Sequence, residues 1–258
     1  VHGGGNIATN DAFGVGALVA NTIGYVNTAV GYQALYSNTE GYYNTAVGHS
    51  SLYTNTTGSY NTAYGIESLY LNTTGYFNTA IGWAALKEND TGNYNTALSY
   101  NALGTNTTGE SNTAIGMNAL ALIDTTSNNI AVGYNSGNAL TGSNNTVIGS
   151  IAGEAGISDT VIIGAGTTER LRINSTGDIL VSTGDIIPVT ATQDLGTVSD
   201  PWQNIYTQDL NLSNEKRVEG NSVDGTKGNW TIQEGEEHLY IINNKSGKKY
   251  RFALEEIQ

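Results

Sequence analysis

A five-residue block recurs along the first two thirds of the chain at a constant spacing. Asn-Thr-Ala-Val-Gly occupies Asn27–Gly31, and closely similar blocks return every 17 residues. A degenerate copy begins at Asn10, and after Asn129 the spacing shortens to 16 and then 15 residues, at Asn145 and Thr160. A fixed period of this kind is the signature of solenoids and arrays, so this feature restricts the fold more than any other.

The remainder of each repeat is equally regular. An Ala-Leu or Ser-Leu pair ends eight residues after the block Asn, an Asn follows three residues later, and a Gly three residues after that. We number the positions of one repeat 1 to 17 from the block Asn. The recurring residues on which the repeat rests are Asn27, Asn44, Asn61, Asn78 and Asn112 at position 1, Gly31, Gly48, Gly65, Gly82 and Gly116 at position 5, and Leu35 at position 9.

The repeat predicts an all-β fold. A period of 17 is short for a helical hairpin, and the abundance of Gly, Asn and Thr disfavours helix. Gly and Asn tolerate the positive φ angles that tight corners need. We therefore predict a parallel β-solenoid (β-roll) of about ten coils of 15–17 residues, with two short strands per coil, over residues 1–166. Coils that rise by about 4.8 Å would make a rod roughly 45–50 Å long.

Identical residues should lie above one another in such a stack. The Ala of position 3, the Leu of position 9 and the Val or Ile of position 4 are predicted to form three inner columns. The position 1 asparagines are predicted to form a ladder of side-chain amides.

The apolar content of one coil indicates an oligomer. One Leu, one Val or Ile and two Ala offset the entropy cost of ordering 17 residues only marginally. Large residues, many of them aromatic, also recur at positions 6, 10 and 17, outside the inner columns. This surplus favours burial against other chains, and we infer a homotrimer with aromatic residues in or beside the interface.

Composition excludes several classes of protein. The 258 residues carry a formal charge of −13, which disfavours nucleic acid as the main partner. There is no cysteine, so disulfide frameworks and thiolate metal sites are excluded. No apolar run reaches the roughly 18 residues of a membrane span, so no membrane insertion is expected. The chain begins at Val1, and its one methionine is Met117, which indicates a fragment or a processed product.

Charge marks a second region. Residues 1–168 hold nine acidic residues and one basic residue, whereas residues 169–258 hold 14 acidic and nine basic residues. Residues 167–200 are predicted to form a hairpin around the turn Asn174–Asp178, followed by a connector. Residues 201–258 are predicted to form a C-terminal β tip. Its strands are expected at Trp230–Gln233, His238–Ile242 and Lys249–Leu254.

The repeat resembles those of phage tail-fibre-like proteins, especially from marine and cyanobacterial tailed phages. With a different period it also resembles repeats in the head domains of trimeric autotransporter adhesins, which are trimers of left-handed parallel β-rolls. Thr168–Val181 is similar to a Glu-Arg-Met-Arg-Ile-Asp stretch common in phage fibres, and Asp194–Tyr206 is similar to a Trp-x-Asn-Ile-Tyr module of the same proteins. Residues 220–252 also resemble cyanophage fibre C-termini. Many such fibres continue into a self-cleaving chaperone; the sequence to Gln258 does not include one, so we expect that it is lacking or has been lost.

The sequence contains little that indicates catalysis. His2, His49 and His238 lie far apart in sequence without metal-ligand spacing. Glu67 and Glu88 stand at different positions of the repeat, so no acid pair recurs that would hydrolyse a glycan. We expect no enzymatic activity, no catalytic or metal-binding residues and no cofactor.

The resemblance implies a structural and adhesive fibre of a phage virion. Such a homotrimer would contact other virion proteins of the tail, baseplate or capsid, and its tip would bind a glycan or protein on the host surface. Trp230, His238, Tyr240 and Tyr250 are the candidate receptor contacts, and the alternative interpretation, which the pattern favours, is that they form the hydrophobic core of a terminal sheet. The aromatic columns of the repeat stiffen the rod or act as stacking platforms for sugar rings. The alternatives are a cellular trimeric surface adhesin, a polysaccharide-depolymerising tailspike and an ice-binding solenoid.

Overall fold

A computed structural model of the chain describes residues 9–182, 209–213, 228–234 and 239–252. The regular elements in these ranges are all β-strands, arranged in one twelve-stranded and one four-stranded sheet. The chain divides into two compact units, Val1–Ile186 and Ile187–Gln258. We describe each unit by itself.

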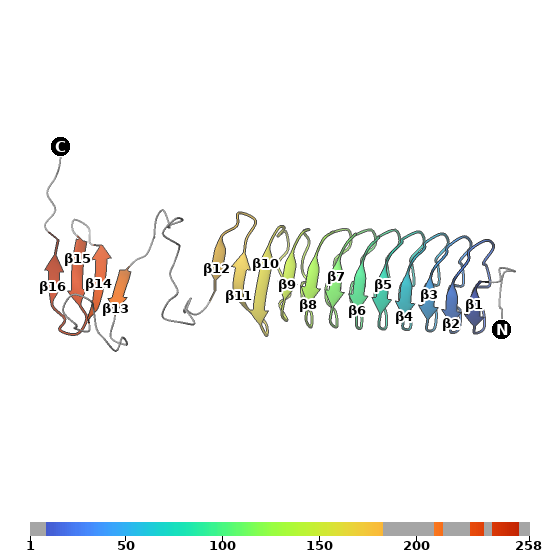
Figure 1. The fold of residues 1–258 in the computed structure, drawn as a ribbon, viewed down its shortest axis with the longest axis horizontal. Helices are drawn as coiled ribbons and strands as arrows, with labels where there is room; N and C mark the ends of the chain where they lie inside the picture. The colour runs from blue at the N-terminus through green and yellow to red at the C-terminus, as the bar shows by residue number, and fades with distance from the viewer. Residues whose placement is uncertain (1–8, 183–208, 214–227, 235–238, 253–258) are drawn as a thin grey trace, which may run out of the picture. The chain divides into compact units, whose positions relative to one another are not determined.

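The first unit is a parallel β-solenoid, as predicted (Figure 1). Each strand pairs in parallel with the next, and like residues face each other in register, for example Ala29 with Ala46. Ten parallel strands are joined by nine complete turns, which matches the expectation of about ten coils. The strands are β1 (Asp11–Phe13), β2 (Thr28–Val30), β3 (Thr45–Val47), β4 (Thr62–Tyr64), β5 (Thr79–Ile81), β6 (Thr96–Leu98), β7 (Thr113–Ile115), β8 (Ile130–Val132), β9 (Thr146–Ile148) and β10 (Val161–Ala165).

Each coil contains one strand, so the prediction of two strands per coil is wrong. The Ala-Leu segment forms turns, because the Leu of position 9 takes the left-handed conformation, as in Leu35 and Leu69, both with φ of 50°. A β-strand needs extended φ angles, so such a residue interrupts any strand. Neighbouring coils are still bonded here, since Leu35 N–H donates to the carbonyl of Ser51 at 3.0 Å.

Two of the three predicted inner columns are buried. The Ala of position 3 and the Leu of position 9 are inaccessible to solvent in nearly every coil, as in Ala46 and Leu52. The Val or Ile of position 4 points outward instead, and Ile81 is 39% exposed. Side chains alternate along a strand, so in a strand of three residues an inward Ala leaves both of its neighbours outside.

The position 1 asparagines form a buried ladder, as predicted, but it joins side chain to backbone. The Oδ1 atom of Asn61 accepts from the backbone N–H of Asn78 at 3.0 Å, and its Nδ2 donates to the carbonyl of Gly75 at 2.8 Å. The ladder of amide bonded to amide is at position 12. There Asn72 Nδ2 donates to Asn55 Oδ1 at 2.8 Å, and Asn89 continues the ladder.

Glycine is required where coils approach most closely. Gly48 at position 5 has a φ of 140°, and a Cβ there would overlap the carbonyl of Gly65 in the next coil. The Gly of position 15 is constrained in the same way, because a Cβ at Gly58 would meet the side chain of Asn55. These two positions explain why Gly recurs in the repeat.

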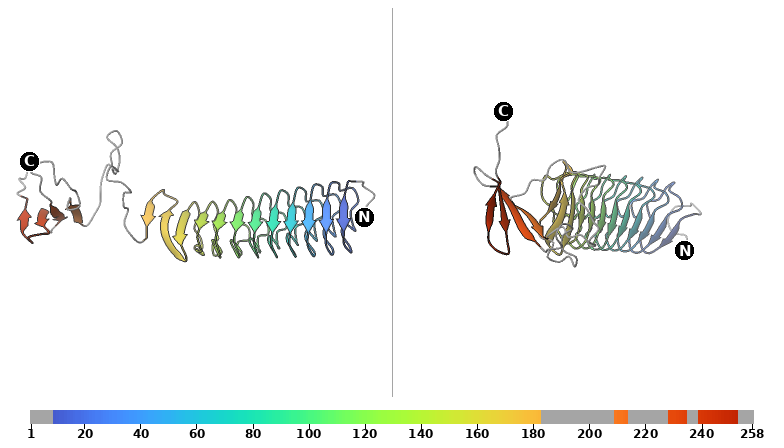
Figure 2. Two further views of the ribbon diagram at one scale, coloured as in Figure 1. Left: turned by 60° about the horizontal axis from the view of Figure 1, so that its bottom comes forward. Right: turned by 60° about the vertical axis from the view of Figure 1, so that its left-hand side comes forward.

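The expected hairpin follows β10 and extends the same sheet (Figure 2). Strands β11 (Thr168–Ile173) and β12 (Ile179–Val181) pair antiparallel, and β11 pairs antiparallel with β10. Arg172 lies in β11 and binds both Glu154, at 2.8 Å, and Glu169, at 2.6 Å. The last parallel strand is therefore covered by an antiparallel pair, and its outer edge is not left open.

The second unit holds a small antiparallel sheet. Strands β14 (Asn229–Glu234), β15 (Leu239–Asn243) and β16 (Lys249–Arg251) form the predicted three-stranded meander, and β13 (Asp209–Ser213) adds a strand that we did not expect. The connector, the Asp194–Tyr206 module and His238 lie outside the described residues.

Candidate functional site

The position 17 side chains form a column of stacked rings on the solenoid surface. Tyr43, Tyr60, Phe77 and Tyr94 follow one another with centroid distances of 5.2, 4.6 and 5.5 Å and with ring planes within 14° of parallel. Between 42% and 53% of each residue is exposed. The coils thus hold four rings in a regular array that is open to ligands.

A second, shorter column at position 16 runs beside the first. Tyr25 stacks on Tyr42 at 5.1 Å. Tyr42 and Tyr76 each contact the neighbouring column edge to face, Tyr42 against Tyr60 at 5.3 Å and Tyr76 against Phe77 at 5.7 Å. We call positions 16 and 17 from Tyr25 to Tyr94 the aromatic double column.

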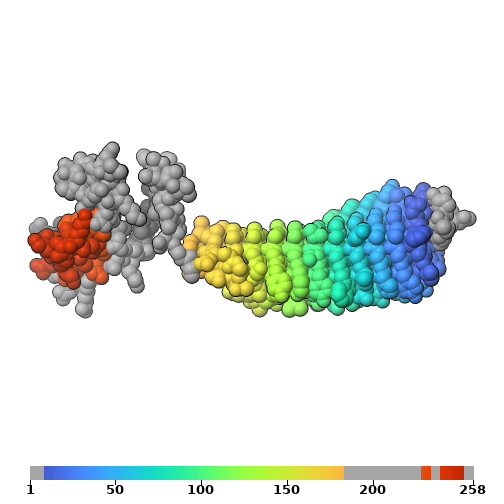
Figure 3. Space-filling view, turned by 90° about the horizontal axis from the view of Figure 1, so that it is seen from below, coloured from blue at the N-terminus to red at the C-terminus, as the bar shows by residue number. Residues whose placement is uncertain are grey.

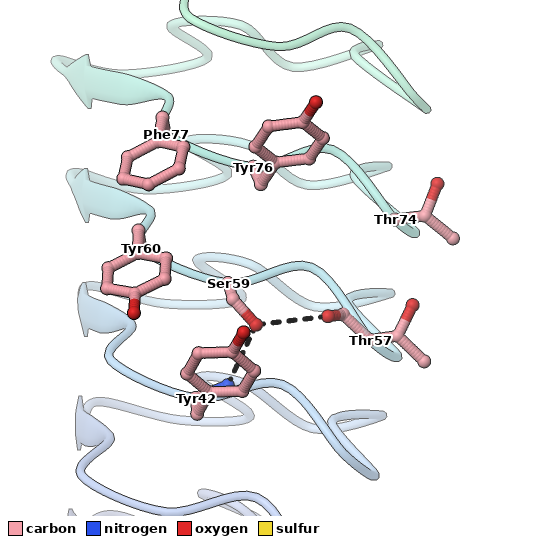
Figure 4. A pocket seen from close by; sticks show the side chains of 7 residues that line it. All are labelled: Tyr42, Thr57, Ser59, Tyr60, Thr74, Tyr76 and Phe77. Atoms are coloured by element: carbon pink, nitrogen blue, oxygen red, sulfur yellow. Dashed lines mark hydrogen bonds between the residues drawn. The ribbon is translucent and has the colours of Figure 1, made fainter.

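Position 16 of the double column lacks an aromatic ring at Ser59 and at Asn93, and only Ser59 has a Tyr at this position in the coil on either side. The shorter side chain leaves a hollow of about 200 Å³, which we call the Ser59 notch. Figure 4 shows Tyr42 and Tyr76 on either side of Ser59 along the stack, with Tyr60 and Phe77 beside them, nearer the strands. The lining residues are Tyr42, Thr57, Ser59, Tyr60, Thr74, Tyr76 and Phe77.

The buried hydroxyl of Ser59 is held in place at the base of the notch. It accepts a hydrogen bond from the backbone N–H of Tyr42 at 3.1 Å and donates to the carbonyl of Thr57 at 3.1 Å. Ser127 stands at the same repeat position four coils further on, and its hydroxyl likewise accepts a hydrogen bond from a backbone N–H, that of Glu110, at 3.0 Å. Ser59 therefore has a local structural role as well as leaving space.

The phenol groups of Tyr60 and Tyr76 have raised pKa values, so both are protonated at neutral pH. Tyr94, by repulsion and by a hydrogen bond, raises the pKa of Tyr76, and Glu110 adds to the effect. Partial burial, followed by repulsion from Tyr42, raises the pKa of Tyr60. A ligand in the notch would meet neutral hydroxyl groups that both donate and accept hydrogen bonds.

A different surface is formed by the outward side chains at positions 4 and 6, which we call the apolar face. Exposed members at position 4 include Ile81 and Leu98, and those at position 6 include Trp83 and Tyr100. In the repeats that contain β1–β9, positions 4 and 6 hold no Asp, Glu, Lys or Arg. Figure 3 shows the successive coils as adjoining bands, so that equivalent side chains follow one another along the solenoid.

Acidic side chains meet at one place that the repeat spacing did not indicate. Glu88 and Asp90 line a hollow of about 390 Å³ together with Thr73 and Leu71. The Asp90 carboxylate already accepts a hydrogen bond from the Thr73 hydroxyl. The hollow spans four consecutive repeats, because Thr54 and Thr107 also line it.

The C-terminal receptor candidates do not share one face of their sheet. Trp230 and Tyr250 lie on the same face, with ring centroids 5.9 Å apart. Tyr240 pairs with Gln233 and with Arg251, so its side chain is on the opposite face. Trp230 and Tyr240 are half-buried, whereas Tyr250 is exposed.

The described part of the chain offers no group of three or more His, Asp or Glu side chains that could hold a metal ion. No helix suited to crossing a membrane occurs among these residues either. Comparison with protein-family models, curated proteins and solved structures finds no match to this chain. The class that the fold defines is a β-solenoid of 17-residue coils with stacked asparagine ladders.

Proposed function

We propose that this chain is the shaft and distal part of a homotrimeric fibre of a phage virion. The fibre is structural and adhesive, it carries out no catalysis, and it attaches the virion to a host surface. The ordered set of fibre-like motifs supports the phage origin, since the repeat, the Thr168–Val181 stretch and the Asp194–Tyr206 module occur in that order.

The observation that carries the trimer is the apolar face. It follows β1 to β9, so at about 4.8 Å per coil it is roughly 38 Å long. Trp83 is 57% exposed and Tyr134 is 54% exposed on it. Monomeric proteins rarely expose continuous apolar surface on this scale, and such patches mark interaction sites.

Identical chains suit this face better than an unrelated partner. Its side chains repeat with the coil spacing, so a second copy lying alongside meets the same spacing and packs in register. Without Asp, Glu, Lys or Arg at positions 4 and 6, no like charges are brought together when copies meet. Closed rotational symmetry then buries the face of every copy.

Sedimentation equilibrium tests the trimer directly. The full chain should sediment at three times its monomer mass of 27.1 kDa. Ile115→Lys places a charge within the apolar face, in β7, and should shift the mass toward the monomer, with the β-sheet circular dichroism signal retained. Thr108→Lys, at an exposed position 14 outside this face, is the matched control and should stay trimeric. A monomeric wild-type chain would refute the proposal.

Attachment is assigned to the C-terminal sheet, with Trp230 and Tyr250 as the contact on one face and Tyr240 on the other. Fluorescently labelled chain should bind intact cells of at least one strain in a panel of marine cyanobacteria. Trp230→Ala with Tyr250→Ala should reduce this binding, while Thr108→Ala on the solenoid should not. If both variants bind cells equally well, the receptor contact does not lie at Trp230 and Tyr250.

A further inference from the structure

We propose that the Ser59 notch is a binding site for one pyranose ring of a neutral glycan. The site lies on the solenoid, whereas the receptor candidates Trp230, Tyr240 and Tyr250 lie in the C-terminal sheet. It would exist whether or not the chain forms trimers, because all of its lining residues belong to consecutive coils of one chain.

The lining has the mixture of groups that a sugar needs. A pyranose presents flat patches of C–H groups together with hydroxyls around its edge. Rings of Tyr42, Tyr60 and Tyr76 provide the apolar surface, while the hydroxyls of Thr57 and Thr74 stand at the edge of the hollow. Small sites of this type combine aromatic walls with a few polar groups that set orientation.

The dimensions fit one ring. Tyr42 and Tyr76 are two coils apart, which corresponds to about 10 Å along the stack. A ring in contact with carbon atoms on both sides needs about 3.5–4.0 Å on each side, or 7–8 Å in all. The remaining space accommodates the pucker of a sugar ring. Where position 16 keeps its Tyr, as at Tyr25 and Tyr42, the rings stand 5.1 Å apart and leave no such gap.

The lining also selects for a neutral ligand. None of the seven lining residues is Asp, Glu, Lys, Arg or His. The raised pKa of Tyr76 keeps its phenol neutral, and Glu110 in its vicinity disfavours an anion. Acidic sugars such as uronic or sialic acids are therefore expected to bind less well than neutral hexoses.

Saturation-transfer difference NMR on the full chain tests the site. The probes are methyl glycosides of α-D-glucose, β-D-galactose and α-D-mannose, observed while protein aromatic protons are saturated. At least one should receive saturation, with a dissociation constant of about 1 mM, as expected for so small a site. Transfer to none of the three would overturn the proposal.

Two matched pairs of variants locate the binding. Ser59→Tyr restores the ring of the column and fills the notch, and should weaken binding at least about tenfold. Ser127→Tyr makes the same change at the same repeat position four coils away and should leave it unchanged. Tyr76→Ala should weaken binding and Tyr25→Ala should not, so the assignment remains testable if Ser59→Tyr misfolds.

Equal transfer in wild type and in the folded Ser59→Tyr variant would refute the site. Sedimentation of the same samples keeps this result separate from the proposed fibre function. A monomer that still binds the probe in the notch would refute the trimer alone, and a trimer that binds no probe would refute the notch alone.

Discussion

Removing one amide from the position 1 ladder should destabilise the solenoid far more than its size suggests. Asn61 is fully buried, and its side chain bonds the carbonyl of Gly75 in its own repeat and the backbone N–H of Asn78 in the next one. In Asn61→Ala, the backbone N–H of Asn78 loses its acceptor in a place that water does not reach. The carbonyl of Gly75 keeps a second donor, the Nδ2 of Asn72 at 3.1 Å.

These contacts set the magnitude. A buried donor left without a partner costs about 1–3 kcal/mol, and the lost bond to Gly75 adds about 0.5–1.5 kcal/mol. We therefore expect Asn61→Ala to lower the free energy of unfolding by about 2–4 kcal/mol. Asn138→Ala changes the same residue type at a half-buried position outside both ladders, and should stay within about 0.5 kcal/mol of wild type.

Hydrogen exchange followed by mass spectrometry or NMR is the most direct assay. The amide of Asn78 should exchange at least about thirtyfold faster in Asn61→Ala, since each 1.4 kcal/mol corresponds to a factor of ten. Amides of distant coils should change less, because each coil contacts only its neighbours. Protection of Asn78 equal to that in Asn138→Ala would show that the ladder does not stabilise the stack.

Three further changes test other parts of the fold. Leu86→Ala opens a cavity in the buried position 9 column and should cost about 2–5 kcal/mol in denaturant unfolding, and a loss below 1 kcal/mol would contradict the tight packing inferred here. Ser99 holds a φ of 114° at position 5, so Ser99→Gly should stabilise the solenoid by about 1 kcal/mol, seen as a higher melting temperature. Arg172→Gln removes the hydrogen bond that is the main cause of the lowered pKa of Glu169, so carboxyl NMR titration should show this pKa rise. Because the folded pKa of Glu169 is lowered, ionised Glu169 stabilises the fold fully above its unfolded pKa of about 4.3. This contribution is lost as the pH falls through the folded pKa. The free energy of unfolding of Arg172→Gln should therefore depend less on pH in the acid range than that of wild type.

The parallel register could be predicted from the sequence, because a block of identical residues at a constant spacing stacks in one consistent way. The same reasoning placed Ala29 and Leu35 inside. The prediction that Val30 points inward was wrong, because we expected two strands per coil and the coil has one strand of three residues. With Ala29 turned inward, alternation leaves Val30 no inward direction.

The corners were harder to predict, because they use residues that ordinarily avoid them. Leu35 has a φ of 50° and Tyr60 a φ of 59°, a conformation that costs L-residues about 1–2 kcal/mol. Bonds between coils hold these residues there, for example from Leu35 N–H to Ser51. Propensity describes a residue alone and does not include such bonds. The Ser59 notch did leave a signal, because Ser59 stands at position 16 between Tyr42 and Tyr76 of the neighbouring coils.

The uniform bonding between coils has a consequence for how such a protein changes in evolution. Because each coil is joined to its neighbours by the same set of bonds, an additional coil inserted after Gly75 or removed there leaves every other junction intact. A gene of this kind can gain or lose seventeen codons by recombination between its own copies without a frameshift or a misfolded product. The length of the solenoid can thereby change in steps of one coil while the coils away from the insertion keep their surfaces.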